Sequence, residues 1–543
     1  MRQFLATTLM AVMMFGPLVN ANAAPVKATA KPAHVPTATP IQHIVVIFQE
    51  NISFDHYFGT YPNATNPSGE PAFTATAGTP SVNGIAGTLS VANPNLNPAN
   101  GTGASNPFRL DRSQSATNDQ DHDYTPEELA FDSGLMDLFP LNTGVAGPPP
   151  GGGGIVDTNG LVMGYYDGNT VTALWNYAQY FAMSDNSYGT NFGPSTDGAL
   201  NLVSGQTNGV IQNENGTGSI IGDGNGGYTL VSDADPIGDV CSTTSGEVLQ
   251  MGGHNIGDLL NTAGISWGFF EGGFNLSIVN PNGTTGCNRS TTSTVTGVNK
   301  KDYIPHHQPF QYYASTYNPQ HTRPTSVMTI GQQGDPGNHQ YDTQDFFAAV
   351  SAGNFPAVSF LKAPGYQDEH AGYSDPLDGQ TFIVDTINFL VQSGSWASTA
   401  VVIAYDDSDG WYDHQQGQVI NTSQTTADGL TGNGLCGIVA PQLAGITAAH
   451  AQGRCGYGPR LPMMVISPYA RQNFVDHTML DQSSIIRFIE DNWLSGQRIG
   501  NGSFDTIANS IASMISVQPN TCKRYELLND QTGEVTMKGC ALP

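Results

Sequence analysis

The stretch that decides the fold is IQHIVVIFQENISFDHYFG, residues 41–59. Its first half is a short apolar run rich in β-branched residues, which predicts a strand buried on both faces. The run ends abruptly at Glu50 and Asn51, a carboxylate next to an amide. In open α/β sheets, binding sites form outside the carboxyl ends of the strands. Two oxygen donors at that place indicate a hard metal ion or a phosphoryl group, with a polar strand cap as the alternative.

The rest of the chain predicts more strands, separated by helices. We expect strands at 181–186, 266–271, 357–361, 401–405 and 463–467, and helices beginning near 125 and covering 172–178, 195–202, 381–392 and 484–493. Strands that alternate with helices favour a mostly parallel sheet with helices on both faces. The expected fold class is therefore α/β, a three-layer sandwich with long loop insertions.

The amino terminus has the pattern of a secretory signal peptide. A basic start at Arg2 precedes a short apolar segment and the small residues Ala21-Asn22-Ala23, which predict cleavage near Ala23 and a secreted or periplasmic protein. The apolar segment is too short to span a membrane, and no later segment approaches that length. We therefore expect a signal peptide at 1–23, an extended proline-containing leader at 24–40, and no stable membrane insertion.

Residues 41–543 are expected to form a single domain. Its loop insertions are predicted near 62–115, 145–160 and 208–253, where Gly, Asn, Pro and Thr dominate. The formal net charge of −27 disfavours a nucleic-acid partner, because phosphate backbones repel so acidic a surface. In an exported chain, six cysteines indicate disulfides. Nearby partners are preferred because short loops cost less entropy to close, which predicts the pairs Cys241–Cys287, Cys436–Cys455 and Cys522–Cys540.

Acidic residues also follow the strand expected at 401–405. Asp406 and Asp407 come directly after it, and adjacent carboxylates repel each other unless a cation or hydrogen-bond donors stand between them. Acidic clusters in loops are commonly only solvated, but this one ends a strand as Glu50 and Asn51 do. Glu50, Asn51, Asp406 and Asp407 therefore predict an oxygen-rich site for one divalent metal ion. Oxygen ligands leave Ca, Mg, Mn, Zn and Fe open.

A hydroxyl group and four histidines complete the predicted site. Ser195 follows Gly193-Pro194 at the opening of a helix, where the helix N-terminus favours an anion; a plain helix cap is the alternative. No Gly-x-Ser-x-Gly elbow surrounds it, so activation by a metal is the expected chemistry. His122, the doublet His306-His307 and His370 are candidates to bind phosphate oxygens or to protonate a leaving group.

Together these motifs resemble a bacterial phosphoesterase family that contains phospholipases C and respiratory-burst-inhibiting acid phosphatases. The resemblance spans roughly residues 41–493 and rests on 50–59, 193–195, 305–310, 369–370, 405–414 and 462–493. It implies an alkaline-phosphatase-like fold and a phosphoric-ester hydrolase. It also implies roles for single residues: metal ligation by Glu50, Asn51, Asp406 and Asp407, nucleophilic attack by Ser195, and phosphate binding or leaving-group protonation by His122, His306, His307 and His370.

The chain departs from the family pattern at several motif positions. Ile52 stands where many members have Arg, and residues 197–199 read Asp-Gly-Ala where many phospholipases have Pro-Asn-Arg. Many members also have Glu in place of Asp407, and Gly-Gly in place of Asp409-Gly410. These differences resemble the acid-phosphatase branch, so a small phosphomonoester is the favoured substrate. A phospholipid headgroup cleaved by phospholipase C activity is the alternative, and a non-catalytic secreted binding protein on the same scaffold is a third.

Overall fold

A computed structural model describes residues 36–147, 153–437, 443–517 and 522–540. The predicted signal peptide and most of the predicted leader lie outside these residues. At the described end of the leader, the backbone N–H of Ala38 donates to the carbonyl of Asn492 (3.0 Å). Residues Thr37–Pro543 form one compact unit.

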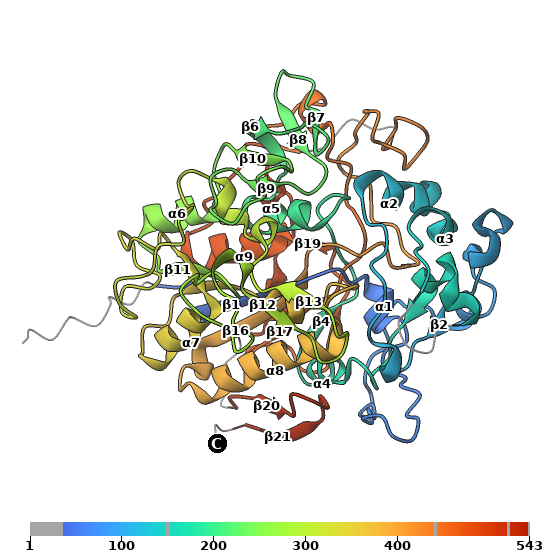
Figure 1. The fold of residues 1–543 in the computed structure, drawn as a ribbon. Helices are drawn as coiled ribbons and strands as arrows, with labels where there is room; N and C mark the ends of the chain where they lie inside the picture. Colours follow the sequence, from blue (N-terminus) through green and yellow to red (C-terminus); the bar gives the residue numbers. More distant parts are fainter. Residues whose placement is uncertain (1–35, 148–152, 438–442, 518–521, 541–543) are drawn as a thin grey trace, which may run out of the picture. The chain divides into compact units, whose positions relative to one another are not determined.

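The centre of this unit is an eight-stranded sheet with the strand order β14-β11-β15-β1-β16-β17-β4-β18; Figure 1 labels β11, β1, β16, β17 and β4. Four strands, β14, β11, β15 and β1, are parallel to one another, and β16 continues the parallel run beside β1. Only β17 runs antiparallel to its neighbours, β16 and β4. The strands are β1 (His43–Gln49), β4 (Ala182–Ser184), β11 (Trp267–Glu271), β14 (Gln340–Asp342), β15 (Val358–Lys362), β16 (Thr399–Tyr405), β17 (Met463–Ile466) and β18 (Phe474–Asp476).

The middle strands are buried because their sequences are apolar on both faces. Every residue of β15 and β16 is buried, as is every residue of β1 after His43. Such continuous apolar runs are typical of parallel strands covered by helices on both sides. The predicted α/β fold with a mostly parallel central sheet is therefore confirmed.

Helices cover both faces of the sheet. Figure 1 shows α5, α6 and α9 on one side and α4, α7 and α8 on the other. The helices are α1 (Phe54–Phe58), α2 (Tyr124–Phe131), α3 (Phe139–Asn142), α4 (Thr172–Tyr180), α5 (Ser195–Ser204), α6 (Ile256–Ala263), α7 (Thr343–Ser351), α8 (Pro376–Gln392) and α9 (Ser483–Trp493).

The predicted insertion at 208–253 contains regular structure that the sequence did not indicate. It forms a five-stranded sheet in the order β7-β8-β6-β10-β9, with β6 (Asn208–Glu214), β7 (Ile220–Gly222), β8 (Tyr228–Leu230), β9 (Asp235–Pro236) and β10 (Val248–Met251). Most of these strands are too short and polar to show an alternating pattern. The remaining strands form two-stranded pairs: β2 (Phe108–Arg109) with β3 (Gly164–Tyr165), β5 (Ser187–Tyr188) with β19 (Leu480–Asp481), β12 (Ser290–Thr292) with β13 (Asn299–Lys301), and β20 (Tyr525–Leu528) with β21 (Val535–Gly539).

All three predicted disulfides are present. They join Cys241 to Cys287, Cys436 to Cys455 and Cys522 to Cys540. The preference for nearby partners therefore chose the correct pairing from the 15 that six cysteines allow. Within the described ranges, no helix combines the length and the apolar character needed to cross a membrane.

Candidate active site

The candidate site lies where three parallel strands end. The register pairs Gln49 with Tyr405 and Ile47 with Leu361, so the carboxyl ends of β1, β16 and β15 meet at one edge of the sheet. The residues at those ends are Glu50, Asp406 and Lys362. All three are buried.

Two buried oxygen atoms at this edge accept no hydrogen bond. Asp406 uses Oδ1 to accept from the backbone N–H groups of Asn51 (2.9 Å) and Asp407 (2.8 Å), and its Oδ2 has no hydrogen bond. The side-chain amide of Asn51 donates through Nδ2 to Asp409 Oδ1 (2.8 Å). This bond fixes the amide, and Asn51 Oδ1 is left buried without a partner.

The backbone that carries these groups adopts unusual angles. Asn51, Glu369 and Asp409 have positive φ values of 65°, 82° and 53°, a region that residues other than glycine seldom occupy. Such conformations persist only where the surrounding structure holds them, and they are common at functional sites. The turns after β1 and β16 are therefore shaped to present particular side chains.

Ser195 lies between two of the carboxylates. It is the first residue of α5, and its Oγ donates toward Glu50 Oε2 (3.0 Å) and Asp407 Oδ2 (3.2 Å). The helix reaches this position because Gly198 has no side chain: a Cβ there would lie 2.2 Å from the carbonyl oxygen of Asp406. The structure thus brings Ser195 together with all four predicted metal ligands.

Sequence reasoning missed Lys362, which is the cation at the centre of the site. Its Nζ contacts Glu50 Oε1 and lies 3.7 Å from Asp406 Oδ2. Lys362 is the last residue of β15, directly after the apolar run expected to end at 361. The rule that singled out Glu50 and Asp406, a polar residue at the end of a buried strand, would also have found it.

Glu127 was missed as well. This buried side chain accepts from Ser408 Oγ (2.5 Å) through Oε1 and from the backbone N–H of Gly193 (3.3 Å) through Oε2. It therefore ties the loop after β16 to the turn that carries Ser195. Its position on α2, in an ordinary helical pattern, gave no signal in the sequence.

The buried carboxyl groups have raised pKa values. Burial, with a contribution from Asp406, raises the pKa of Glu50 to about 8, although Lys362 acts in the opposite direction. Burial and Asp407 raise the pKa of Asp406 to about 6. Burial and the charges of Glu50 and Glu127 raise the pKa of Asp407 to about 7, although the charge of His122 acts to lower it. Lys362 and His122 therefore do not offset the effects of burial and mutual repulsion on these carboxyl groups.

Of the four predicted histidines, three lie around this cluster. His307 Nδ1 is 3.4 Å from Glu50 Oε1, and burial together with the charges of Lys362 and His306 lowers its pKa well below the ordinary value. His122 and His370 are neighbours, with ring centroids 5.9 Å apart. Burial lowers the pKa of His122, but nearby aspartates, Asp407 first among them, outweigh burial and raise it well above the ordinary value.

His306 points to a different set of partners. Its Nδ1 lies 3.3 Å from Asp235 Oδ1 and its Nε2 4.0 Å from Asp233 Oδ2, both in the insertion that carries β9. Its ring packs edge-on against His307 at a centroid distance of 4.6 Å. The structure thus places His306, partly exposed, beside His307, with its ring nitrogens facing Asp233 and Asp235.

The four predicted ligands fit a divalent cation. They supply only oxygen donors, which suits hard cations, and two of those oxygens, Asn51 Oδ1 and Asp406 Oδ2, are buried without a hydrogen bond. Buried polar atoms are rarely left unpaired. A cation beside these oxygens would remove both deficits.

A prediction for the metal-free protein follows from these pKa values. The pKa values of Glu50, Asp407 and Asp406 in the folded protein lie above the value of about 4 expected in the unfolded chain, so the folded state binds more protons between about pH 4 and pH 8. The stability that these groups contribute is fully present below about pH 4 and is lost as the pH rises through their folded pKa values. We expect the melting temperature of chelated protein to fall by several degrees from pH 5 to pH 8.

Differential scanning calorimetry of chelated protein at both pH values measures this change. Glu50→Gln, which removes one titrating group, should show a smaller fall than the wild type. An equal or larger fall in Glu50→Gln would exclude Glu50 as a source of the pH dependence.

Comparisons with known proteins assign the chain to a family. The model of the Phosphoesterase family matches residues 41–494. Phospholipase C A of Mycobacterium tuberculosis is 25% identical over 482 residues, which cover 84% of this chain and 73% of that protein. A non-hemolytic phospholipase C of Burkholderia pseudomallei is 25% identical over 491 residues, covering 88% of this chain but only 58% of its own length.

The chain also aligns with a crystal structure of an alkaline phosphatase superfamily protein from Vibrio parahaemolyticus. That alignment has 13% identity and a TM-score of 0.27, and it covers 66% of this chain and 67% of the other. The family match covers most of the chain, including every predicted site residue, and it confirms the predicted enzyme class. The chain belongs to the Phosphoesterase family of phosphoric-ester hydrolases.

Proposed function

We propose that the protein hydrolyses phosphoric esters with Ser195 as nucleophile and with a divalent cation held by Glu50, Asn51, Asp406 and Asp407. The observation that carries the proposal is the position of Ser195 Oγ, 3.0 Å from Glu50 Oε2 and 3.2 Å from Asp407 Oδ2. A serine hydroxyl within hydrogen-bond distance of two buried carboxylates can pass its proton to one of them as it attacks. When bound, the cation would stabilise the alkoxide of the serine and the charge on the phosphoryl oxygens.

The reaction would proceed in two displacements at phosphorus. In the first, Ser195 Oγ forms a bond to phosphorus while the bond to the ester oxygen breaks, and a histidine gives a proton to that oxygen. In the second, a water oxygen attacks phosphorus, the bond to Ser195 breaks, and inorganic phosphate or a phosphomonoester is released. Ser195 is the first residue of α5, so the positive end of the helix dipole would favour a phosphoryl group bound there in both steps.

Histidines would surround the phosphoryl group during both displacements. His307, beside Glu50, and the neighbouring pair His122 and His370 are the candidates to bind phosphoryl oxygens or to protonate the leaving group. His306, which packs against His307 and turns its ring nitrogens toward Asp233 and Asp235, is a candidate for the same roles.

We favour a small phosphomonoester as substrate because the motif differences at Ile52, Asp407 and Asp409 resemble the acid-phosphatase branch. The curated relatives reported above favour a second candidate, because both are phospholipases C. Those enzymes would imply a phospholipid diester as substrate. The third interpretation, a binding protein without turnover, gives no chemical reason for the position of Ser195 between two carboxylates.

Two chromogenic substrates distinguish these interpretations. We expect purified protein supplied with divalent cations to release p-nitrophenol at least about ten times faster from p-nitrophenyl phosphate than from p-nitrophenylphosphorylcholine. Such a ratio corresponds to about 1.4 kcal/mol of transition-state discrimination. The opposite ratio would support phospholipase C activity, and no release from either substrate would support the binding protein.

A further inference from the structure

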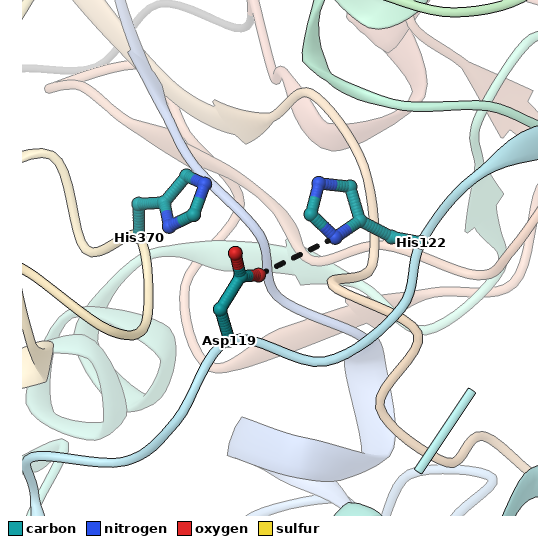
Figure 2. A group of neighbouring side chains, drawn as sticks. All are labelled: Asp119, His122 and His370. Atoms are coloured by element: carbon teal, nitrogen blue, oxygen red, sulfur yellow. Dashed lines mark ion pairs between the residues drawn. The ribbon is translucent and has the colours of Figure 1, made fainter. Parts of the chain in front are cut away.

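A lysine on the hairpin of β12 and β13 lies beside the candidate active site. Lys300 is the middle residue of β13 and is partly buried, and its Nζ lies 3.5 Å from the ring centroid of Tyr373. The Tyr373 ring also stacks on the ring of His370, with centroids 4.3 Å apart. Figure 2 shows His370 near His122, with the carboxylate of Asp119 between the two rings. One aromatic ring thus joins Lys300 to a histidine that is a candidate to bind phosphate.

The hairpin is fixed to the turn after β15. The backbone N–H of Gly365 donates to the carbonyl of Asp302, directly after β13 (3.0 Å). In the turn of the hairpin, the hydroxyl of Thr296 donates to the carbonyl of Tyr373 (3.2 Å). The two segments approach closely because Gly365 has no side chain: a Cβ there would lie 3.0 Å from Lys300 Cγ. Packing and hydrogen bonds therefore fix the position of Lys300 beside Tyr373.

Lys300 lacks an anionic partner. The chain has 45 acidic residues and only 18 basic ones, yet Lys300 forms no ion pair within the part of the chain that the structure describes. The face of Tyr373 attracts its charge but offers no lone pair to its N–H donors. Lys362 differs in this respect, because its Nζ contacts Glu50 and lies 3.7 Å from a carboxylate oxygen of Asp406. Lys300 therefore keeps donors available for an anion that arrives with a ligand.

The charge of Lys300 also acts on groups of the candidate site. Burial lowers the pKa of Lys300, whereas the charges of nearby carboxylates, among them Asp368 and Glu50, act to raise it. Burial lowers the pKa of His370 to about 3, and the charge of Lys300 acts in the same direction. Lys300 is therefore within electrostatic range of a predicted metal ligand and of a predicted phosphate-binding histidine.

We propose that Lys300 forms an anion subsite next to the phosphoryl site, which selects phosphomonoesters whose leaving group carries a second negative charge. This inference rests on the proposed function and narrows its substrate class. The ammonium group is a compact charge on a flexible stem, so it can follow leaving groups of different length. A leaving group without charge gains nothing from this subsite.

Two phosphonates that differ by one charge test the proposal without turnover. In 4-(phosphonomethyl)benzoate a carbon atom replaces the ester oxygen, so the bond to phosphorus is not hydrolysed, and the methyl ester of this ligand lacks the carboxylate charge. Titration calorimetry of the full chain, supplied with divalent cations, measures both dissociation constants. We expect the wild type to bind the carboxylate at least about ten times more tightly than the ester, since close charge pairs in binding sites contribute that much or more.

Lys300→Gln and Lys301→Gln form a matched pair of variants. Neighbouring side chains of a strand point to opposite faces, and Lys301 is exposed. Lys300→Gln should abolish the preference for the carboxylate and leave the affinity for the methyl ester unchanged, which also shows that the site is intact. Lys301→Gln removes the same charge from the same strand and should retain the wild-type preference.

Several results would overturn the subsite. These are an equal affinity of the wild type for both ligands, a wild-type preference in Lys300→Gln, an equal loss of affinity for both ligands in that variant, and a loss of preference in both variants. Failure of the proposed function would be seen separately, because binding of a phosphonate requires no nucleophile. An active Ser195→Ala would contradict the proposed mechanism and leave these dissociation constants unaffected.

Discussion

Ser195→Ala should lower the rate of phosphate release at least about 1000-fold, since removal of a nucleophile eliminates the covalent route altogether. Ser195 Oγ is the atom within hydrogen-bond distance of both Glu50 and Asp407, and alanine has nothing to replace it. The helix should persist, because Ser195 does not cap it: the N-cap residue is Pro194. The measurement is steady-state hydrolysis of p-nitrophenyl phosphate at saturating metal.

A matched substitution on the same helix provides the control. Ser204 is also buried in α5, and its Oγ donates to the carbonyl of Leu200 (2.9 Å), far from the carboxylates along the helix. Ser204→Ala removes the same atom and should retain near-wild-type activity. Wild-type activity in Ser195→Ala would remove this serine from the mechanism, whereas equal losses in both variants would show that the helix, not the nucleophile, was damaged.

Trapping the phosphorylated enzyme would extend this test. Protein mixed with substrate and quenched in acid should carry one additional phosphate on the peptide that contains Ser195. Absence of that phosphate in an active enzyme, with no burst of p-nitrophenol in the first turnover, would favour direct attack by water over the two displacements.

Much of the site could be predicted because it follows buried parallel strands. The apolar runs that end at Gln49 and Tyr405 fix the positions of Glu50 and Asp406, and parallel pairing places both at one edge. The helix start at Ser195 was visible for a similar local reason, the Gly-Pro turn before it. For these three residues the local pattern and the long-range packing agree, so their positions could be predicted from the sequence.

Other features depend on packing that no local pattern records. The antiparallel direction of β17 is one, because an apolar run is the same in either direction. The partners of His306 are another: they lie in an insertion whose short strands could not be recognised. Lys362 could have been identified from the sequence as the polar end of a strand, but its pairing with Glu50 depends on the register of β15 beside β1. The role of Glu127 could not have been predicted, because only the fold brings α2 against Ser408.

Removal of the metal should also strongly lower the rate of phosphate release. Chelation is expected to lower phosphate release at least about 100-fold, since a catalytic cation contributes several kcal/mol to the stabilisation of the transition state. Without the ion, Asn51 Oδ1 and Asp406 Oδ2 have no hydrogen bond, and Asp406 Oδ2 keeps only its ion pair with Lys362 Nζ at 3.7 Å. Activity should return when a divalent cation is added back.

Asp406→Asn links this loss to the predicted ligands. The substitution keeps the shape of the side chain and an oxygen acceptor but removes the charge. The cation concentration for half-maximal activity should therefore rise at least about tenfold, since the loss of groups that merely orient metal ligands already weakens metal binding by about that factor. Asp428→Asn is the control, because Asp428 is also buried but binds Tyr124 and Ser423 instead. Unchanged metal dependence in Asp406→Asn would contradict its assignment as a ligand. If chelated wild-type protein kept full activity, the cation would have no part in the reaction, and Lys362 would be left as the group that balances the charge of the phosphoryl oxygens.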